Sequence, residues 1–237
     1  MYTDFHCHIL PGIDDGSPDT DISVKMAEAE KKSGIGRIVA TPHFYMSEQS
    51  VDSFLRRRED AYGQLSPLIG DIELICGAEV LYTHSLADAD LKKLCIGDTG
   101  YMLIELPYQR LSSDFIRSFR SFANEISSDI SLILAHAERY LSFTDEESVC
   151  EIIDAADMLV QLNCGSFRTF SNTSKFVMNM VKNGAAHLLG TDCHNITTRP
   201  PDMDTARKAI SKKLSSATFD RLMKNAEVIA SGGRIGD

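Results

Sequence analysis

Potential metal ligands are concentrated in two short stretches near the ends of the chain. The first, DFHCHILPGIDDG (residues 4–16), contains His6 and His8, and the second, GTDCHN (190–195), contains Asp192 and His194. In an extended strand, side chains two residues apart point to the same side. We therefore expect each pair to present two donors to one side of its strand, with the intervening cysteine on the other side.

Single potential ligands follow several other apolar runs. In ATPH, GAEV, LIEL and LAHAER they are His43, Glu79, Glu105 and His136. A carboxylate in an apolar strand is rarely buried without a partner, and imidazole and carboxylate both suit Zn²⁺, Mn²⁺ or Fe²⁺. Because one tetrahedral ion needs only four ligands, this donor set predicts two or three ions. An isolated His-x-His motif would also fit a structural role instead of metal binding. For the single histidines His84 and His187 we expect a structural role.

Short β-rich runs alternate with helical patterns along the chain. The expected strands cover residues 2–7, 37–41, 72–80, 101–106, 130–136, 158–163 and 186–192. One helix is expected to begin at a capping aspartate, Asp21, and to end at Gly34 in a left-handed conformation. This alternation predicts an α/β fold, a closed or nearly closed parallel barrel in a single domain over residues 1–237. Such a barrel gathers the ends of its strands, and hence the ligands, at one face.

The composition disfavours several functional classes. The net charge of −10 argues against proteins that bind nucleic acid or anionic membranes non-specifically. No apolar run is long enough to span a bilayer, and the opening MYTDFHCH has no signal-peptide pattern. The six cysteines are scattered, without a Cys-x-x-Cys spacing, which favours reduced thiols. We therefore expect a cytoplasmic protein without membrane insertion and without a nucleic-acid partner.

The ligand motifs resemble those of a known enzyme superfamily. FHCHILPGIDDG, ATPH, GAEV, LIEL, HAER, QLNCGS and GTDCHNITTRPP lie within residues 4–201 and are similar to motifs of the polymerase and histidinol phosphatase (PHP) superfamily. More narrowly, they resemble the bacterial manganese-dependent protein-tyrosine phosphatases of capsule and exopolysaccharide operons. The resemblance implies a distorted (β/α)7 TIM-like barrel of the PHP type with a trinuclear metal site. Mn²⁺ is the first expectation, with Fe²⁺ and Zn²⁺ as alternatives.

The resemblance also implies how the ligands divide among the ions. One ion would be surrounded by His6, His8, Glu79 and Asp192. A second would be held by Glu79, Glu105 and His136, with Glu79 as the bridge. The third would be held by Asp15, His43 and His194. Asp15 directly precedes Gly16 and fits the family pattern, so Asp14 is expected to shape the loop or to support a ligand.

Two arginines, Arg139 and Arg199, match positions where the family binds phosphate. A planar guanidinium suits bidentate phosphate contacts, although each arginine would also fit an ordinary surface salt bridge. The implied reaction is in-line attack of a metal-bridging hydroxide on phosphotyrosine, without a covalent phosphoenzyme. Because the leaving phenol has a pKa of about 10, no general acid is assigned. The implied partner is a phosphotyrosine-bearing protein, specifically a bacterial tyrosine autokinase that controls extracellular polysaccharide synthesis.

Other interpretations use the same residues. Cys193 and Arg199 have the Cys-x5-Arg spacing of cysteine-dependent tyrosine phosphatases, although the intervening HNITT contains no glycine. A small-molecule phosphatase acting on histidinol phosphate would need the same metal ligands. A non-enzymatic barrel that binds a kinase is disfavoured because every motif keeps competent side chains. A nuclease is disfavoured because no basic tract could follow a nucleic-acid backbone.

Overall fold

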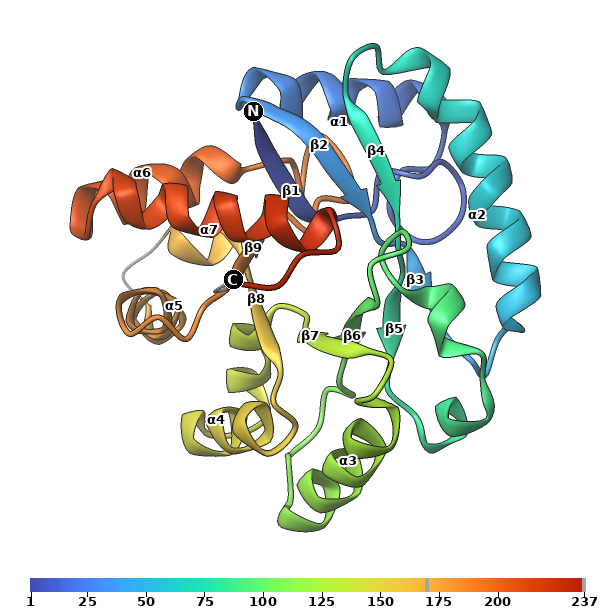
Figure 1. Cartoon of the computed structure of the whole chain (residues 1–237). Coiled ribbons are helices and arrows are strands. Elements are labelled where there is room, and N and C mark those ends of the chain that lie inside the picture. The colour runs from blue at the N-terminus through green and yellow to red at the C-terminus, as the bar shows by residue number, and fades with distance from the viewer. Residues whose placement is uncertain (169–170, 236–237) are drawn as a thin grey trace.

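The computed structural model describes residues 1–168 and 171–235, in which strands and helices alternate (Figure 1). The strands are β1 (Tyr2–Cys7), β2 (Ile35–Ala40), β3 (His43–Phe44), β4 (Glu73–Cys76), β5 (Glu79–Leu81), β6 (Tyr101–Glu105), β7 (Ser131–Leu134), β8 (Leu159–Asn163) and β9 (Leu188–Gly190). The α-helices are α1 (Thr20–Lys32), α2 (Val51–Leu65), α3 (Ser113–Ile126), α4 (Glu146–Ala155), α5 (Asn172–Lys182), α6 (Met203–Lys213) and α7 (Ser216–Ala230). Shorter 3₁₀ segments cover Ser66–Leu68, His84–Asp88, Leu91–Leu94, Ala137–Ser142 and Cys164–Phe167.

The strands pair in parallel and form a curled sheet. One sheet has the order β1-β2-β4 and the other the order β3-β5-β6-β7-β8-β9. β2 and β3 are two halves of one long strand broken at Thr41–Pro42, and β4 and β5 are two halves broken at Gly77–Ala78. Backbone hydrogen bonds from Gly77 N to Ala40 O (2.8 Å) and from Glu79 N to Pro42 O (3.0 Å) carry the pairing across both breaks. The described residues thus form seven parallel strands, two of them composite, and the breaks account for the distortion of the barrel.

The first and last strands meet and close the curl. Cys7 and Cys193 form a parallel bridge. Backbone hydrogen bonds also run from His8 N to Cys193 O (3.0 Å) and from Asp192 N to His6 O (2.7 Å). The expectation of a closed or nearly closed α/β barrel is confirmed.

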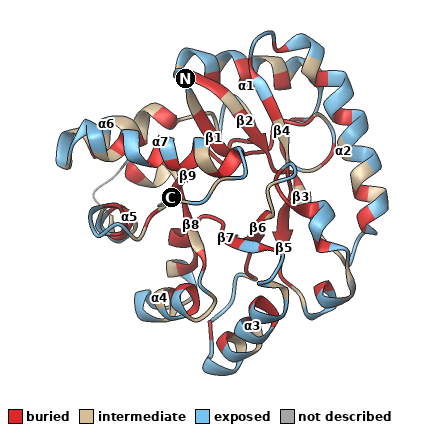
Figure 2. Ribbon diagram, in the orientation of Figure 1, coloured by how far each residue is buried: buried red, intermediate tan, exposed pale blue. Residues whose placement is uncertain are grey.

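Two apolar clusters hold the fold together. The larger one fills the space between the barrel and the surrounding helices and includes Met26, Phe54 and Phe119. The smaller one includes Phe5 and Leu103 from the strands and residues of α7. Figure 2 shows most of the strand residues buried, apart from parts of β4 and the start of β7, whereas the outer sides of the helices are exposed. The helices therefore protect the barrel, and α7 packs against its interior cluster.

The start of α1 differs from the sequence expectation. The N-cap is Asp19, whose backbone is extended and whose side chain accepts a hydrogen bond from Ile22 N at 2.9 Å. Asp21 lies in the first turn, where its charge interacts favourably with the helix dipole, so its expected role as the cap is wrong. Gly34 follows the helix with φ +86°, as expected for a left-handed position.

Candidate metal centre

The first strand is irregular where it carries its two histidines. Asp4–Cys7 spans three steps of β1 but pairs with Ile38–Ala40, which spans two steps of β2. This is a β-bulge, which redirects side chains locally. Phe5 joins the interior apolar cluster, and the neighbouring His6 and the fully buried His8 both reach the metal-ligand groups. The bulge therefore places two donors and an apolar support in one short strand.

His6, His8, Glu79 and Asp192 form the most buried of the candidate metal groups that contain histidine. Both imidazole Nε2 atoms lie 3.2 Å from Glu79 Oε2. The Nε2 atoms of His6 and His8 lie 3.6 and 3.4 Å from Asp192 Oδ1. Tetrahedral bonds of about 2.1 Å would separate neighbouring donors by roughly 3.4 Å. The four side chains are therefore spaced as ligands of one ion.

Glu79, at the start of β5, lies between this group and a second one. Its Oε1 is 2.6 Å from His136 Nε2, while its Oε2 is 3.0 Å from His43 Nδ1. Glu105, at the end of β6, has Oε1 at 3.6 Å from His136 Nε2. Because its two oxygens face different histidines, Glu79 has the geometry of a bridging carboxylate.

A third group lies at the solvent side of the site. Asp15 Oδ1 is 3.4 Å from His43 Nε2 and 3.5 Å from His194 Nε2. His8 completes this group, in which all donor atoms lie within 4.8 Å of one another. The Asp15 side chain is 69% exposed. This group is therefore the one most open to an arriving substrate.

Asp14 supports the ligands from behind. Its Oδ2 lies 2.7 Å from His8 Nδ1 and accepts a hydrogen bond from the backbone N–H of His43 at 2.9 Å. Its Oδ1 accepts from Gly16 N. Burial alone would raise the pKa of Asp14, but the His8 imidazole outweighs it and lowers that pKa. Asp14 therefore orients His8 and leaves Asp15 to face the third group.

The donor atoms fit divalent cations. In the described part of the chain, Glu79 Oε2, Asp192 Oδ1 and His194 Nε2 are buried without a hydrogen-bond partner. These atoms also face the centres of the groups. Burial lowers the pKa of His194 to about 3, which keeps its imidazole neutral, the form that binds a metal. The donors are nitrogen and oxygen, and this set accepts Mn²⁺, Fe²⁺ or Zn²⁺.

Of the three non-glycine residues with positive φ in the described part of the chain, two are candidate ligands. His136 has φ +33° and Asp192 has φ +52°, and each lies two residues after the end of a strand, β7 and β9 respectively. Such left-handed conformations are uncommon for residues other than glycine and are typical of functional sites. Here they turn each side chain into the site at the end of its strand.

Arg139 and Arg199 meet at the rim of the centre. Arg139 Nη1 is 3.2 Å and Arg199 Nη2 is 2.7 Å from the same oxygen, Asp192 Oδ2. Both guanidinium groups border a pocket of about 290 Å³ that also contains Arg168. The opposite oxygen of Asp192 faces the histidines. Asp192 therefore links the two arginines to the candidate ligands.

Residues 2–230 match the family described as capsular polysaccharide synthesis, CpsB/CapC. The chain belongs to the CpsB/CapC family. It is 28% identical to the tyrosine-protein phosphatase YwqE of Bacillus subtilis, over 95% of this chain and 90% of that protein. It is 27% identical to the tyrosine-protein phosphatase CpsB of Streptococcus pneumoniae, over 89% of this chain and 90% of that protein.

Solved structures show the same fold as this CpsB/CapC chain. One solved structure comes from work on YwqE from Bacillus subtilis and CpsB from Streptococcus pneumoniae, which are described as unique metal-dependent tyrosine phosphatases. This structure superimposes on the chain with a TM-score of 0.83 at 24% identity. It covers 98% of this chain and 96% of the other. Histidinol phosphate phosphatase from Lactococcus lactis gives a TM-score of 0.54 at 13% identity, over 89% of this chain and 93% of the other. The chain therefore shares its barrel fold with both of these phosphatases.

In this family member, Cys193 does not face the pocket. Its side chain is fully buried, and its Sγ lies 3.2 Å from Cys7 Sγ and 3.7 Å from Glu30 Oε1. Arg199 lies instead with Asp192. The Cys-x5-Arg spacing is therefore coincidental, because its thiol and its guanidinium belong to different environments.

Two amide residues of β8 were missed by the sequence analysis. Gln161 Oε1 lies 3.1 Å from His6 Nδ1 and accepts a hydrogen bond from His136 N at 2.8 Å. Its Nε2 donates to Asn163 Oδ1, and Asn163 Nδ2 donates to Asp192 Oδ2 at 2.7 Å. Their signal was the alternation of polar residues in QLN, which places both amides on one side of the strand.

Two tyrosines, also missed, flank the ligands. Tyr45 stacks on His43 with ring centroids 5.2 Å apart, and Tyr108 stacks on His136 at 6.3 Å. The guanidinium carbon of Arg139 lies 5.2 Å above the Tyr108 ring. Tyr108 is 38% exposed. An aromatic surface therefore lies between an arginine and the candidate ligands, in reach of a substrate.

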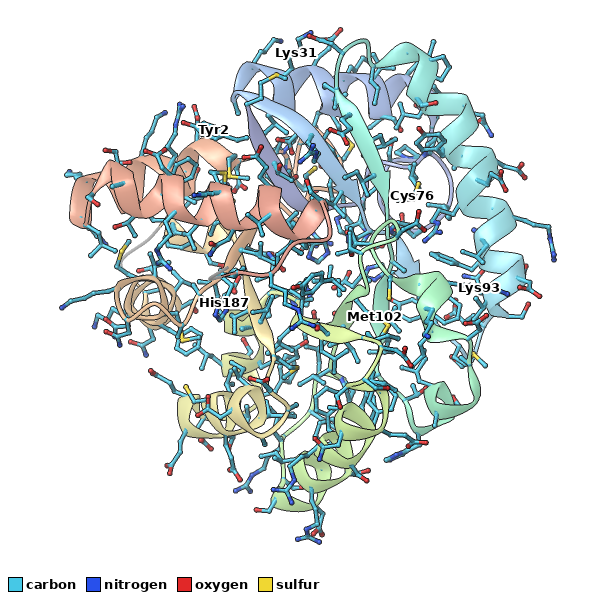
Figure 3. The ribbon with its side chains drawn as sticks, viewed as in Figure 1. Tyr2, Lys31, Cys76, Lys93, Met102 and His187 are labelled. Carbon is cyan, nitrogen blue, oxygen red and sulfur yellow. The ribbon has the colours of Figure 1, made fainter. Side chains whose placement is uncertain are left out.

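The two histidines expected to be structural lie outside the candidate groups. His187, labelled in Figure 3, precedes β9, and its Nδ1 accepts a hydrogen bond from Val160 N at 3.0 Å. His84 begins a 3₁₀ segment and packs against the Tyr82 ring. Neither belongs to a candidate metal group among the described residues.

Proposed function

We propose that this protein is a metal-dependent protein-tyrosine phosphatase that acts in capsular or extracellular polysaccharide synthesis. One observation carries the proposal. Three groups of donors, most of them buried, are joined by the shared residues His8, His43 and Glu79, and two arginines border the same centre. Membership of the CpsB/CapC family and the names of its relatives support phosphotyrosine as the substrate.

Eight of the ligands proposed for the ions belong to the three groups, and the ninth, His136, lies outside them but contacts Glu79 Oε1 at 2.6 Å. The ligands are His6, His8, Asp15, His43, Glu79, Glu105, His136, Asp192 and His194. We propose Mn²⁺ first, because a site without sulfur does not select for softer ions; Fe²⁺ and Zn²⁺ would also be accepted. Bound ions would lower the pKa of water and so provide a strong nucleophile at neutral pH. They would also stabilise the negative charge on the phosphoryl oxygens.

The side chains around the ions would position the substrate. Arg139 and Arg199 would exchange their contacts with Asp192 for the phosphoryl oxygens, where a guanidinium stabilises the developing charge. Tyr108 would pack against the tyrosine ring. Because a phenol leaves readily, these residues need not include a strong general acid. Since Cys193 is buried away from the pocket, no cysteine phosphoenzyme is involved.

We propose a bacterial tyrosine autokinase as the phosphorylated partner and the cytoplasm as the location. None of the described helices is long and apolar enough to cross a membrane. The six cysteines are free thiols, as expected in a reducing compartment. The open pocket of about 290 Å³ beside the arginines suits a side chain presented on a flexible segment of another protein.

The test compares two substrates with purified protein. A phosphotyrosine peptide and histidinol phosphate are each assayed with Mn²⁺, with Mn²⁺ and excess chelator, and without added metal. We expect chelator-sensitive turnover with a higher kcat/KM for the peptide. A higher kcat/KM for histidinol phosphate would reassign the substrate, and turnover that persists in the chelator would contradict the metal site.

A further inference from the structure

A second cluster of potential ligands lies on the outer side of β1, away from the proposed centre. It consists of Asp4, Cys7, Glu30 and Cys193, all fully buried, and we call it the β1–α1 cluster. Asp4 and Cys7 belong to β1, Glu30 to α1, and Cys193 to the segment after β9. The cluster therefore joins the first strand, the first helix and the last strand.

The four ligand atoms of the β1–α1 cluster are closely spaced. Cys7 Sγ lies 3.2 Å from Cys193 Sγ, which lies 3.7 Å from Glu30 Oε1. All four residues offer ligand atoms within 4.8 Å of one another. Two sulfur ligands of a tetrahedral zinc ion, each bonded at about 2.3 Å, are separated by roughly 3.7 Å. The two sulfur atoms, at 3.2 Å, lie closer together than in an occupied zinc site, and all four ligand atoms are close enough to share one ion.

The β1–α1 cluster has too few hydrogen-bond donors for its acceptors. Asp4 accepts from the backbone N–H groups of His6 (3.3 Å) and Thr191 (2.8 Å). The hydroxyl of Thr191 lies 2.6 Å from Asp4 Oδ2 and 3.1 Å from Glu30 Oε1, and its one proton cannot fully serve both. Glu30 Oε2 has no partner in the described part of the chain. No lysine or arginine among the described residues forms an ion pair with either carboxylate.

A buried carboxylate without a partner is costly, and either a proton shared between Asp4 and Glu30 or a bound cation would remove that cost. Thiolate and carboxylate together are ligands of Zn²⁺ and similar ions, and thiolate selects against Mn²⁺. Four protein ligands with no open position are typical of a structural site. The place also fits a structural role, because a single bridge, Cys7 to Cys193, pairs the first strand with the segment after the last one.

We propose that Asp4, Cys7, Glu30 and Cys193 form a structural site for one thiophilic divalent cation, Zn²⁺ or an ion of the same class, separate from the phosphatase centre. The ion stabilises the junction between β1, α1 and the segment after β9. Because the ligands are buried, the ion is captured while the chain folds. The proposal is independent of the reaction at the other face of β1.

Cobalt distinguishes this site from the phosphatase centre. The full chain is unfolded with denaturant, chelator and reductant, freed of chelator, and refolded with Co²⁺. The proposed phosphatase ligands are nitrogen and oxygen atoms, so a sulfur-to-cobalt charge-transfer band in the near ultraviolet reports thiolate ligation alone. We expect the band in the unsubstituted protein and in Glu79→Gln. Its absence from the refolded unsubstituted protein overturns the proposal.

Cysteine variants locate the ligands. The band should disappear in the double variant Cys7→Ser/Cys193→Ser, which should bind one ion fewer per chain. It should persist in Cys95→Ser, a control for another buried thiol, and in Cys150→Ser, a control for a partly exposed one. A band that survives loss of Cys7 and Cys193, or that needs Cys150, means adventitious thiol binding and overturns the proposal.

Two further measurements do not depend on the double variant folding. X-ray absorption of the unsubstituted protein refolded with Zn²⁺ should show sulfur scatterers at about 2.3 Å. Glu30→Gln, which keeps the shape of the side chain but removes its charge, should weaken or shift the cobalt band. Zinc surrounded by nitrogen and oxygen alone, or a Cys7–Cys193 disulfide in the intact mass, would overturn the proposal and leave the two carboxylates to share a proton.

Discussion

Glu79 is the residue on which the candidate centre depends most. Burial alone would raise the pKa of its carboxyl group, but His6 and His136 outweigh burial and hold that pKa well below the usual range. The carboxylate is therefore ionised among imidazoles that also face Asp192 and Glu105. A charged bridge of this kind holds neighbouring cations together and cannot be replaced by a neutral amide.

Glu79→Gln should therefore impair both metal binding and turnover. Losing several kcal/mol of charge stabilisation predicts a fall in kcat/KM of at least roughly a thousandfold. The measurement pairs phosphotyrosine-peptide kinetics with the metal content of the purified variant. Glu59→Gln, on the exposed side of α2, is the matched control and should behave like the unsubstituted protein. Near-normal turnover in Glu79→Gln would refute the bridging role.

Gln161 acts through the histidines that it contacts. Its Oε1 fixes both the His6 ring and the backbone of His136. Gln161→Leu keeps the side chain's bulk but loses these contacts, and we expect a 10–100-fold loss of metal affinity, roughly, as for other residues that orient ligands. Titration of activity with Mn²⁺ measures the shift, and turnover at saturating Mn²⁺ should largely recover. Gln64→Leu on the exposed side of α2 serves as the control.

Sequence indicates the proposed ligands more readily than the residues that would orient them. His43, Glu79 and His136 are identifiable because few other roles suit an imidazole or a buried carboxylate at a strand end. Gln161 and Tyr108 are common residue types whose roles depend on neighbours from other strands. The identity of the supporting residues therefore required the packed structure.

At the scale of elements, the contact between β9 and β1 determines where the histidines lie. A Cβ atom on Gly190 would lie 2.4 Å from His6 Cβ, 3.0 Å from His6 N and 2.9 Å from Gln161 Nε2. His6 N and His6 Cβ belong to the backbone of β1 or are bonded directly to it, so they cannot move unless the strand moves. Only glycine therefore lets the two strands approach closely enough to close the barrel around the site.

Gly190→Ala should separate these strands, with a loss of about 1–3 kcal/mol in the free energy of unfolding and a loss of activity. Gly63→Ala is the matched control, because it lies within α2 with nothing within 4 Å of its added Cβ. That substitution should stabilise the protein by up to about 1 kcal/mol. Urea unfolding measures both changes. Equal effects of the two substitutions would contradict the close packing at Gly190.

The order of the elements was predictable, but their irregularities were not. Apolar runs and the turn at Gly34 indicated where strands and a helix lie. The bulge in β1 and the breaks at Thr41–Pro42 and Gly77–Ala78 depend on how neighbouring strands align. Asp19 and Asp21 both fit a cap by residue type, and only the extended backbone of Asp19 distinguishes them.

At the scale of the whole molecule, the barrel brings like charges together. Glu105 illustrates the cost, because burial and the nearby Glu79 carboxylate raise its pKa. The protein also carries a net charge of −10. Folding without cations must therefore overcome repulsion at one end of the barrel, and bound cations should stabilise the native state over the unfolded one.

Metal binding should therefore raise the melting temperature in a concentration-dependent way. A cation at 100 times its Kd adds about 2.7 kcal/mol for each independent site. For a chain of this size that corresponds to roughly 5–11 °C. Differential scanning calorimetry with increasing Mn²⁺ measures the rise, and excess chelator should reverse it. Glu79→Gln should show a much smaller rise than Glu59→Gln, because the first loses the shared ligand and the second belongs to no candidate metal group among the described residues. An equal rise in both variants would mean that Mn²⁺ stabilises the protein from the surface.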